Sequence, residues 1–547
     1  MPKLFIDNRE VEVDKGATIL DAAGKLGIEI PTMCFLKGYK SSTSCMVCVV
    51  KIDGSASLVP ACGTIVKDGM HVESNSEQVH QARKAALELL LSDHVGDCHG
   101  PCQVICPARM NIPLMIRQIA AGKFREAIAT VKKDIALPAV LGRICPKPCE
   151  QGCRRAVFDE AVSICLLKRY VADLDLQSSN PYLPPCKPSQ DKRVAIVGAG
   201  PAGLAAAYYL QQAGLRCTVF DDHEKPGGML RYAVPKEHLP TEVLDREIAL
   251  IEKLGMKFKG QTRIGTDLLM EDLRRDFDAV FVAVGQLKPG DAKSMELKEV
   301  TNGIAIDNKT YQTNLQDIFA GGDAVHKRKL TVRAVADGKE AAVSISQYLS
   351  PPKADSVTGP VKEFNTRIGK LMDGEIEKFL TCADKAKRTS PSGKDGGFTD
   401  KQARKEATRC LHCDCRKADT CKLKQYAQDY QAKPTRYKGQ RRLFTQQIQS
   451  RTNYHLCKDS ALPDVQMGES GSISAGDIIY EAGKCIDCGL CIQTAAKAGE
   501  RLGLTFIGRG FDVRVAVPFG RSIADALKHS ADQCVKACPT GALAFRK

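Results

Sequence analysis

The stretch Val194–Leu210, VAIVGAGPAGLAAAYYL, decides the fold of the middle of the chain. An apolar run ends in Gly198-x-Gly200-x-x-Gly203 and leads into a second apolar run with helix-forming composition. These glycines permit a tight turn, close approach of a pyrophosphate and close helix–strand packing, and the helix N-terminus offers N–H groups to phosphates. About twenty residues later, Asp221 ends the next predicted strand, in position for a ribose hydroxyl. The stretch predicts a Rossmann-like dinucleotide-binding domain, without separating NAD from FAD.

Two segments farther along separate these alternatives. KPGGMLRYAVP at 225–235 resembles the second glycine-rich turn of glutamate-synthase-type flavoproteins, and IFAGGDAV at 318–325 resembles their late strand–Gly–Asp motif. The resemblance implies FAD, with Asp323 on the ribityl chain; a flavin-free NAD domain is the alternative. The residues expected to bind the cofactor are Gly198, Gly200, Gly203, Asp221, Gly227, Gly228, Arg231, Gly322 and Asp323.

The segment between these motifs is unusually short. In the resembled family, a second Rossmann domain for NAD(P)H is inserted before the Gly–Asp motif. Here FDAVFVAVGQ at 277–286 is followed by that motif after about thirty residues, too few for a nucleotide-binding βαβαβ unit. No second glycine fingerprint occurs in the chain. We therefore expect no NAD(P)H site on this chain.

Cysteine content dominates the composition of the whole chain. It has 24 cysteines in 547 residues, and its N-terminus is charged and strand-like rather than a signal peptide. Cytosolic thiols stay reduced, so metal ligation is favoured over disulfides, and a cytoplasmic location is expected. No apolar stretch is long enough to span a bilayer. The formal charge of +15 suggests nucleic acid, but thiolate-ligated clusters would offset much of it and no nucleic-acid motif is present.

The first cysteine set lies in residues 1–80. Its spacing is C-x10-C-x2-C-x13-C, which suits a [2Fe–2S] centre, with structural zinc as the alternative. LFIDNREVEV followed by a turn at 14–16 predicts a hairpin, and residues 17–27 predict a short helix. GATILDAAGKLGIEIPTMCF resembles the ferredoxin-like start of the large iron–sulfur subunit of complex I and related hydrogenases. The set comprises Cys34, Cys45, Cys48 and Cys62.

Helical apolar spacing at 77–93 leads into the second region, which spans residues 81–185. CHGPCQVICP and GRICPKPCEQGC resemble the N-terminal cluster domain of the glutamate synthase small subunit, shared with dihydropyrimidine dehydrogenase and with bifurcating NADH–ferredoxin:NADP oxidoreductases. The resemblance implies two [4Fe–4S] clusters with crossed ligands. It assigns Cys98, Cys102 and Cys153 to one cluster, and Cys106, Cys145 and Cys149 to the other.

Each of these clusters needs a fourth ligand. The family's extra cysteine is missing here, and His94 takes the His-x3-Cys arrangement of the complex I subunit, so we predict it as a ligand; a solvated helix-end histidine is the alternative. At the family's Glu or Gln position stands Lys168, which cannot ligate iron. Cys165 lies one helical turn earlier on the same face and is the predicted substitute, with an inert buried cysteine as the alternative.

The third set follows a segment at 385–400 whose composition predicts a flexible connector. RCLHCDCRKADTC, within the segment 401–460, places four cysteines within twelve residues, and both [4Fe–4S] and zinc fit that spacing. Similar segments follow the flavin domain in glutamate-synthase-like proteins associated with formate dehydrogenases. The set comprises Cys410, Cys413, Cys415 and Cys421.

The fourth set lies in residues 470–547 and resembles a two-cluster ferredoxin in which one cluster has been lost. Ala495, Lys528 and Ala531 occupy positions where the second cluster would need cysteines, and Cys534 is left over. FIGRGFDVRVAVPFGRS and CPTGAL also resemble the ferredoxin-like part of the complex I large subunit. The complete set is Cys485, Cys488, Cys491 and Cys538. The cysteines without companions, predicted to be structural, are Cys186, Cys217, Cys382 and Cys457.

The sequence predicts a multidomain α/β and α+β protein: a β-grasp-like ferredoxin domain, a helical two-cluster domain, a Rossmann-like FAD domain at 190–352, a [4Fe–4S] segment and a C-terminal ferredoxin-like domain. The expected cofactors are FAD, one [2Fe–2S] cluster and four [4Fe–4S] clusters. We expect an electron-transfer subunit of a hetero-oligomeric complex, whose partners are an NADH- or ferredoxin-linked flavoprotein and a substrate-converting metalloenzyme subunit. An independent reductase or bifurcating enzyme, and a scaffold with vestigial cofactors, are the alternatives.

Overall fold

The chain forms two compact units, and both are discontinuous in sequence. The computed structural model describes residues 1–350, 357–361, 363–380, 383–437, 478–510 and 513–545. Unit 1 comprises Met1–His99, Glu363–Cys382 and Cys413–Lys547, and unit 2 comprises Gly100–Lys362 and Ala383–His412. The five domains predicted from the sequence are consecutive segments, whereas in the structure unit 2 interrupts unit 1. The boundary between His412 and Cys413 divides the third cysteine segment.

Unit 1 begins with a mixed five-stranded sheet in the order β2-β1-β5-β3-β4. Strands β1 and β5 are parallel and the other pairs are antiparallel. The buried residues Leu4, Ile6 and Val11 pack against the α1 residues Ile19 and Ala22. The strands are β1 (Lys3–Ile6), β2 (Arg9–Glu12), β3 (Val49–Ile52), β4 (Val59–Pro60) and β5 (Met70–Glu73). This sheet with one helix packed on it is the expected β-grasp-like arrangement.

The first hairpin turns earlier than the sequence suggested. β1 and β2 are joined at Asp7 and Asn8, whose φ angles are 48° and 65°, and not after residue 12. Asp and Asn tolerate the left-handed region that a two-residue hairpin turn requires, so the DN dipeptide was the stronger signal. Helix α1 (Ile19–Lys25) matches the prediction, with a Thr18–Asp21 capping box at its start.

Helix α2 (Glu77–Ser92) matches the predicted helix at 77–93 and packs against β3 and against α17 (Lys422–Asp429). The C-terminal part holds two two-stranded sheets, β13 (Ile478–Tyr480) with β16 (Leu543–Phe545), and β14 (Thr505–Ile507) with β15 (Arg514–Ala516). The remaining helices are α15 (Glu375–Leu380), α17 (Lys422–Asp429), α19 (Leu490–Lys497), α20 (Ile523–Ala526) and α21 (Ala531–Ala537). Short helices joined by cysteine-bearing loops therefore make up this part.

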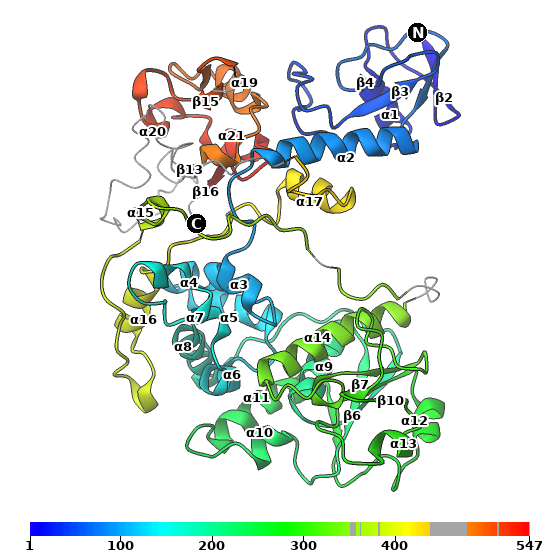
Figure 1. Cartoon of the computed structure of the whole chain (residues 1–547), viewed down its shortest axis with the longest axis vertical. Coiled ribbons are helices and arrows are strands. Elements are labelled where there is room, and N and C mark those ends of the chain that lie inside the picture. Colours follow the sequence, from blue (N-terminus) through cyan, green and yellow to red (C-terminus); the bar gives the residue numbers. More distant parts are fainter. Residues whose placement is uncertain (351–356, 362, 381–382, 438–477, 511–512, 546–547) are drawn as a thin grey trace. The chain divides into compact units, whose positions relative to one another are not determined.

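Unit 2 starts with a helical subdomain, drawn in cyan in Figure 1. Its core is built from the apolar faces of α4, α5, α6 and α8, and α6 packs along α8. The helices are α3 (Pro101–Ile105), α4 (Ile112–Ala120), α5 (Phe124–Asp134), α6 (Pro138–Ile144), α7 (Pro148–Gln151) and α8 (Ile164–Gln177), with the 3-10 turn η1 at Arg154–Val157. Several of these helices are short, and cysteines stand at their ends.

A parallel five-stranded sheet in the order β12-β9-β6-β7-β8 forms the second half of unit 2. Helices α9 (Pro201–Gln212) and α14 (Thr331–Tyr348) pack closely against each other (Figure 1). The glycine at position 338 permits this approach, because a Cβ atom added there would be only 2.2 Å from the carbonyl oxygen of Ala202. The strands are β6 (Arg193–Val197), β7 (Arg216–Phe220), β8 (Lys257–Lys259), β9 (Ala279–Val282) and β12 (Ile318–Ala320). The prediction of a Rossmann-like domain is confirmed.

The connections of this sheet are short. α10 (Met229–Tyr232) and α11 (Thr241–Lys253) join β7 to β8, and α12 (Met270–Asp276) precedes β9. Between β9 and β12, the structure has α13 (Asp291–Ser294) and a small hairpin of β10 (Glu299–Val300) and β11 (Gly303–Ile304). Among the described residues, no helix has the length and apolar character needed to cross a membrane.

Residues 383–412 return to unit 2 and lie along its helical subdomain. They include α16 (Asp400–Ala407). Arg388 donates to Ser163 Oγ at 2.7 Å, and the Thr389 N–H donates to Glu406 at 2.8 Å. The prediction of a flexible connector at 385–400 was therefore wrong, because its polar residues find defined partners in the folded unit.

Candidate functional site

The four cysteines of the first set come together in unit 1, and all are buried. Cys48 precedes β3 and Cys62 follows β4, and their Sγ atoms are 3.4 Å apart. Hydrogen bonds from the thiols of Cys45 and Cys62 lower the pKa of Cys34, and the same contact with Cys34 raises the pKa of each donor. Four thiols in mutual contact are the donor set that a [2Fe–2S] cluster needs.

A second set surrounds a buried lysine of unit 2. Cys106, Cys145 and Cys149 lie at or near the ends of α3, α6 and α7, and Cys165 lies in α8. Burial alone would lower the pKa of Lys168, but the thiolates of Cys165, Cys145, Cys149 and Cys106 outweigh it and raise that pKa. The structure thus gathers the four cysteines predicted for one cluster, and the ammonium offsets their negative charge.

Cys165 is held in place from both sides. Its side chain and that of Cys145 form a thiol–thiol hydrogen bond, which lowers the pKa of Cys145 to about 6. Its backbone N–H donates to Glu150 Oε1 at 2.9 Å, and Glu150 Oε2 accepts from Arg388 at 2.7 Å. The Cys165 thiol also lies within hydrogen-bond distance of the carbonyl oxygens of Leu141 and Gly142, at 3.4 Å and 3.6 Å. The structure thus places Cys165 where the predicted ligand role requires it, next to Cys145.

Cys165→Ala is expected to remove about four irons per chain and one [4Fe–4S] signal from anaerobically purified protein, because the cluster then has only three thiolates. Iron analysis and electron paramagnetic resonance (EPR) measure both. The matched control is Cys217→Ala, since Cys217 is equally buried but lies in β7 with no thiol partner among the described residues. Unchanged iron content in Cys165→Ala would assign the residue to packing.

The fourth set lines a single cavity in unit 1. Its wall includes Cys485, Cys488, Cys491 and Cys538, together with Pro539. Burial raises the pKa of the Cys488 thiol to about 12, so a cationic partner is needed to hold the thiolate form. The set predicted from the ferredoxin-like spacing is thus brought together.

Close packing occupies the place of the missing second ferredoxin cluster. Ala495, Ala531 and Cys534 are all buried in one hydrophobic core. The Cys534 thiol donates to the carbonyl oxygen of Cys491 at 3.6 Å, and Cys534 is not part of the cavity wall. This arrangement fits the interpretation of Cys534 as a leftover.

The remaining cysteines divide between the units in a way the sequence did not indicate. Cys98, Cys413, Cys415 and Cys421 lie in unit 1. The carbonyl oxygen of Cys98 accepts from the Cys415 N–H at 3.2 Å. Burial raises the pKa of Cys421 to about 11, and the thiolates of Cys415 and Cys98 contribute to that rise. Cys98, Cys415 and Cys421 are therefore neighbours.

Cys102, Cys153 and Cys410 belong to unit 2. Cys102 lies in α3, which packs on α7, and α7 ends two residues before Cys153. Burial raises the pKa of Cys153, and the Arg409 guanidinium acts against that rise. Cys410 directly follows Arg409 and is buried in the same core as the helical subdomain.

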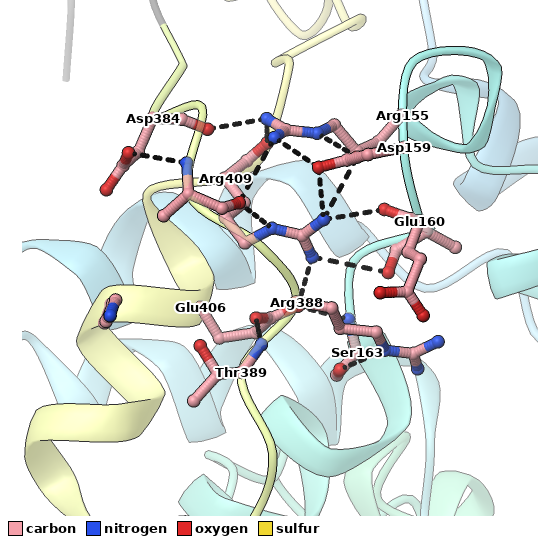
Figure 2. A network of polar contacts seen from close by, with 12 residues as sticks. Arg155, Asp159, Glu160, Ser163, Asp384, Arg388, Thr389, Glu406 and Arg409 are labelled. Atoms are coloured by element: carbon pink, nitrogen blue, oxygen red, sulfur yellow. Dashed lines mark hydrogen bonds and ion pairs between the residues drawn. The ribbon is translucent and has the colours of Figure 1, made fainter.

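A polar network joins Arg409 to Arg155 and Asp159, as Figure 2 shows. Arg409 donates to both oxygens of Asp159 at 3.1 Å and to Glu406 at 2.8 Å. Arg155 donates to Asp159 at 2.6 Å and 2.8 Å, and to the Arg409 carbonyl oxygen at 3.1 Å. Both arginines and Glu406 are fully buried. Hydrogen bonds from Arg155 hold the pKa of Asp159 well below its usual range, so the network stays charged.

The predicted nucleotide site has the glycine geometry that the motif requires. β6 ends just before Gly198, whose φ is +107°, and α9 begins at Pro201 without a side-chain cap. A Cβ on Gly203 would be 1.9 Å from the Gly198 carbonyl oxygen, whereas a Cβ on Gly200 would meet nothing within 4 Å. The open space at Gly200 and the uncapped N-terminus of α9 fit a bound pyrophosphate.

The other predicted cofactor residues stabilise the loops around this turn. Asp221 accepts from the Ala199 N–H at 2.6 Å, Arg231 donates to the Pro226 carbonyl oxygen at 2.7 Å, and Asp323 accepts from the Lys329 N–H at 3.2 Å. Gly228 lies close to the first glycine turn, because a Cβ atom added at Gly228 would be 2.8 Å from the Cα atom of Gly200. Gly227 and Gly322 adopt φ angles of +133° and +71° that favour glycine. The structure brings the first and second glycine turns together.

Some residues at these sites belong to no motif in the sequence. Lys484 is buried beside Cys415, and it forms an ion pair with Glu481 at 2.7 Å. Glu150 and Arg409 position cysteine-bearing backbone, as described above. No spacing rule marks these residues, because each of them contacts a group that lies elsewhere in the chain. Cys382 and Cys457 lie outside the described residues.

Comparisons with known proteins identify three domain types. Residues 2–77 match the 2Fe-2S iron-sulfur cluster binding domain, and residues 73–180 match dihydropyrimidine dehydrogenase domain II, 4Fe-4S cluster. Residues 196–255 match the NAD(P)-binding Rossmann-like domain. The resemblance to iron–sulfur proteins is thereby confirmed, and a match of 38% identity over 188 residues to the glutamate synthase [NADPH] small chain of Bacillus subtilis, covering 34% of this chain and 38% of the relative, confirms the resemblance to glutamate-synthase-type proteins. The chain carries iron–sulfur and Rossmann-like domains typical of oxidoreductases.

Curated relatives share about a third of this chain. It is 42% identical over 188 residues to the NADPH-Fe(3+) oxidoreductase subunit beta of Geobacter sulfurreducens, covering 34% of this chain and 28% of the relative. It is 40% identical over 206 residues to the NADP(+)-dependent formate dehydrogenase subunit beta of Moorella thermoacetica, covering 34% and 29%. It is 40% identical over 191 residues to the NAD-dependent dihydropyrimidine dehydrogenase subunit PreT of Escherichia coli, covering 34% and 46%. The chain thus spans less than half the length of these relatives.

Proposed function

We propose that this chain is an FAD- and iron–sulfur-containing electron-transfer subunit of a multisubunit cytoplasmic oxidoreductase. It would relay electrons between an NAD(P)H- or ferredoxin-linked partner and a catalytic partner of the formate dehydrogenase, hydrogenase, or tungsten/molybdenum reductase type. FAD, one [2Fe–2S] and four [4Fe–4S] clusters would supply the redox chemistry, and the protein would position and tune them. The names of the relatives, each a subunit of a redox enzyme, support this proposal.

The observation that carries the proposal is the proximity of three cysteine sets in unit 1. Cys34 and Cys45 of the first set, Cys421, and Cys488 of the fourth set are buried in one hydrophobic core. The Ser42 hydroxyl donates to the Cys488 carbonyl oxygen at 3.2 Å, and Lys417 donates to the Cys538 carbonyl oxygen at 2.6 Å. Electrons move between centres only over short distances, so neighbouring cysteine sets in one hydrophobic core suit a relay.

Adding NADH or NADPH to the isolated chain is expected to leave the flavin oxidised for minutes. In the resembled family, a second nucleotide-binding domain is inserted between the strands that correspond to β9 and β12. In the described part of this chain, only the short helix α13 and a hairpin of two short strands, β10 and β11, lie there. Stopped-flow absorbance at the flavin band measures the reaction. Dithionite is the control, since it must bleach the same preparation; bleaching by either nucleotide at a comparable rate would contradict the proposal.

An enzyme in its own right is the second candidate, with the flavin reducing a small molecule or bifurcating electrons. Its support is that the Rossmann-like sheet and the helices carrying the Lys168 cysteine set share one hydrophobic core in unit 2. Turnover of a substrate by the isolated chain, without partner subunits, would favour this candidate over the relay. Co-purification of the chain with its partners from the native organism would favour the relay.

A further inference from the structure

We propose that Cys98, Cys415 and Cys421 are ligands of one iron–sulfur cluster, and that Cys102, Cys153 and Cys410 serve a different one. This partition rests on the proposed function, because it assumes that these cysteines hold clusters. It differs from the family resemblance, which grouped Cys98 with Cys102 and Cys153. It also divides the compact third segment, which spacing alone assigned to a single metal.

The first group is defined by contacts inside unit 1. The backbone hydrogen bond from Cys415 to Cys98 at 3.2 Å ties two segments that are far apart in sequence. Cys421 immediately precedes α17, and the N–H of its neighbour Lys422 donates to the Pro539 carbonyl oxygen at 2.9 Å, which holds that end of α17 in unit 1. The Thr366 hydroxyl lies 3.3 Å from Cys98 Sγ and donates to the Gly96 carbonyl oxygen at 2.8 Å, so it fixes the backbone that leads to Cys98.

His94 completes this group. It stands four residues before Cys98 and two residues after the last residue of α2, in the same unit. The Val95 N–H donates to the Gly483 carbonyl oxygen at 2.7 Å, and Asp97 accepts from the Ile368 N–H at 2.9 Å. The backbone between His94 and Cys98 is thus held at two points. One imidazole and three thiolates make four ligands, the number that a [4Fe–4S] cluster requires.

The second group is defined by contacts inside unit 2. The Arg155 and Arg409 network attaches the backbone before Cys410 to the turn that follows Cys153. On the other side, Ile105 in α3 packs against Gly152, where a Cβ would be 3.0 Å from the Ile105 side chain. Cys102 is in that same helix. Three cysteines from three segments of unit 2 are therefore brought to one place.

Paired alanine variants test the partition in anaerobically purified protein. Cys98→Ala and Cys415→Ala are expected to remove the same EPR component, and the double variant is expected to lose about four irons, no more than one cluster. Cys102→Ala is expected to remove a different component, which stays intact in the Cys98/Cys415 double variant. Cys186→Ala is the control, since Cys186 is exposed and should change nothing.

The opposite pattern would overturn the partition: Cys98→Ala and Cys102→Ala removing one shared component while Cys415→Ala removes another. If alanine variants do not accumulate, the serine variants give the same test, because a serine oxygen retains iron while shifting the signal of its own cluster. A wild-type chain without iron would instead defeat the proposed function. The two failures are therefore distinguishable.

Discussion

Arg409→Ala is expected to lower the free energy of unfolding by about 3–5 kcal/mol, which corresponds to a fall of roughly 6–20 °C in the unfolding temperature. The substitution removes the guanidinium between Asp159 and Glu406, and it leaves the fully buried Glu406 carboxylate without its cationic partner. It also releases the segment that carries Cys410. Thermal unfolding of the cluster-loaded protein, followed by far-UV circular dichroism, measures the shift.

Lys405→Ala is the matched control, because Lys405 lies exposed on α16 of the same segment and should shift the unfolding temperature by no more than about 1 °C. The EPR component that Cys102→Ala removes should weaken in Arg409→Ala as well, while the signal of the Cys485 set stays unchanged. Equal stability of Arg409→Ala and Lys405→Ala would show that the network is not an anchor.

Gly200→Ala is expected to reduce flavin occupancy to about a tenth or less while the chain still folds. The added methyl group meets no protein atom within 4 Å, but it would occupy the space in which a pyrophosphate approaches the start of α9. Flavin released by acid and quantified by absorbance gives the occupancy, and circular dichroism reports the fold.

Gly203→Ala separates the two roles of the glycine motif. Its methyl group would lie 1.9 Å from the Gly198 carbonyl oxygen, so we expect loss of both flavin and stability. Gly24→Ala in α1 is the control, since it meets nothing within 4 Å and should leave the flavin content at the wild-type level. Full flavin content in Gly200→Ala would place the dinucleotide elsewhere.

Local patterns in the sequence were sufficient for much of the fold and for three cysteine sets. The glycine turn, the β-grasp-like sheet and the Cys34 and Cys485 sets depend on spacings within one or two loops. The position of Cys165 beside the other three cysteines of the Lys168 set could also be predicted, because one helical turn relates it to Lys168. These features share a property: the contacting residues are either close in sequence or repeat with a helix or strand period.

Long-range contacts were not predictable in this way. Nothing in the periodicity shows that unit 2 is inserted between Cys98 and Cys415. The short spacing of the third segment therefore predicts a single metal site, whereas the structure divides that segment between the two units. Similarly, Arg388 and Thr389 had the composition of a linker, since their partners Ser163 and Glu406 are identified only by the fold. The sequence does not show which partner a polar or charged side chain contacts, because that depends on the residues that the fold brings near it.

The discontinuity of unit 1 has a consequence for biosynthesis. Cys98 leaves the ribosome roughly 300 residues before Cys415, which at usual rates of translation is a delay of roughly 15–60 s. The Cys34 set and the Lys168 set are each contained in continuous stretches and can be loaded with iron during that interval. The cluster that we assign to Cys98 has to wait for Cys415 and Cys421, and the cluster that we assign to Cys102 has to wait for Cys410. These two clusters, together with the Cys485 set, are therefore expected to be completed after the Cys34 and Lys168 sets.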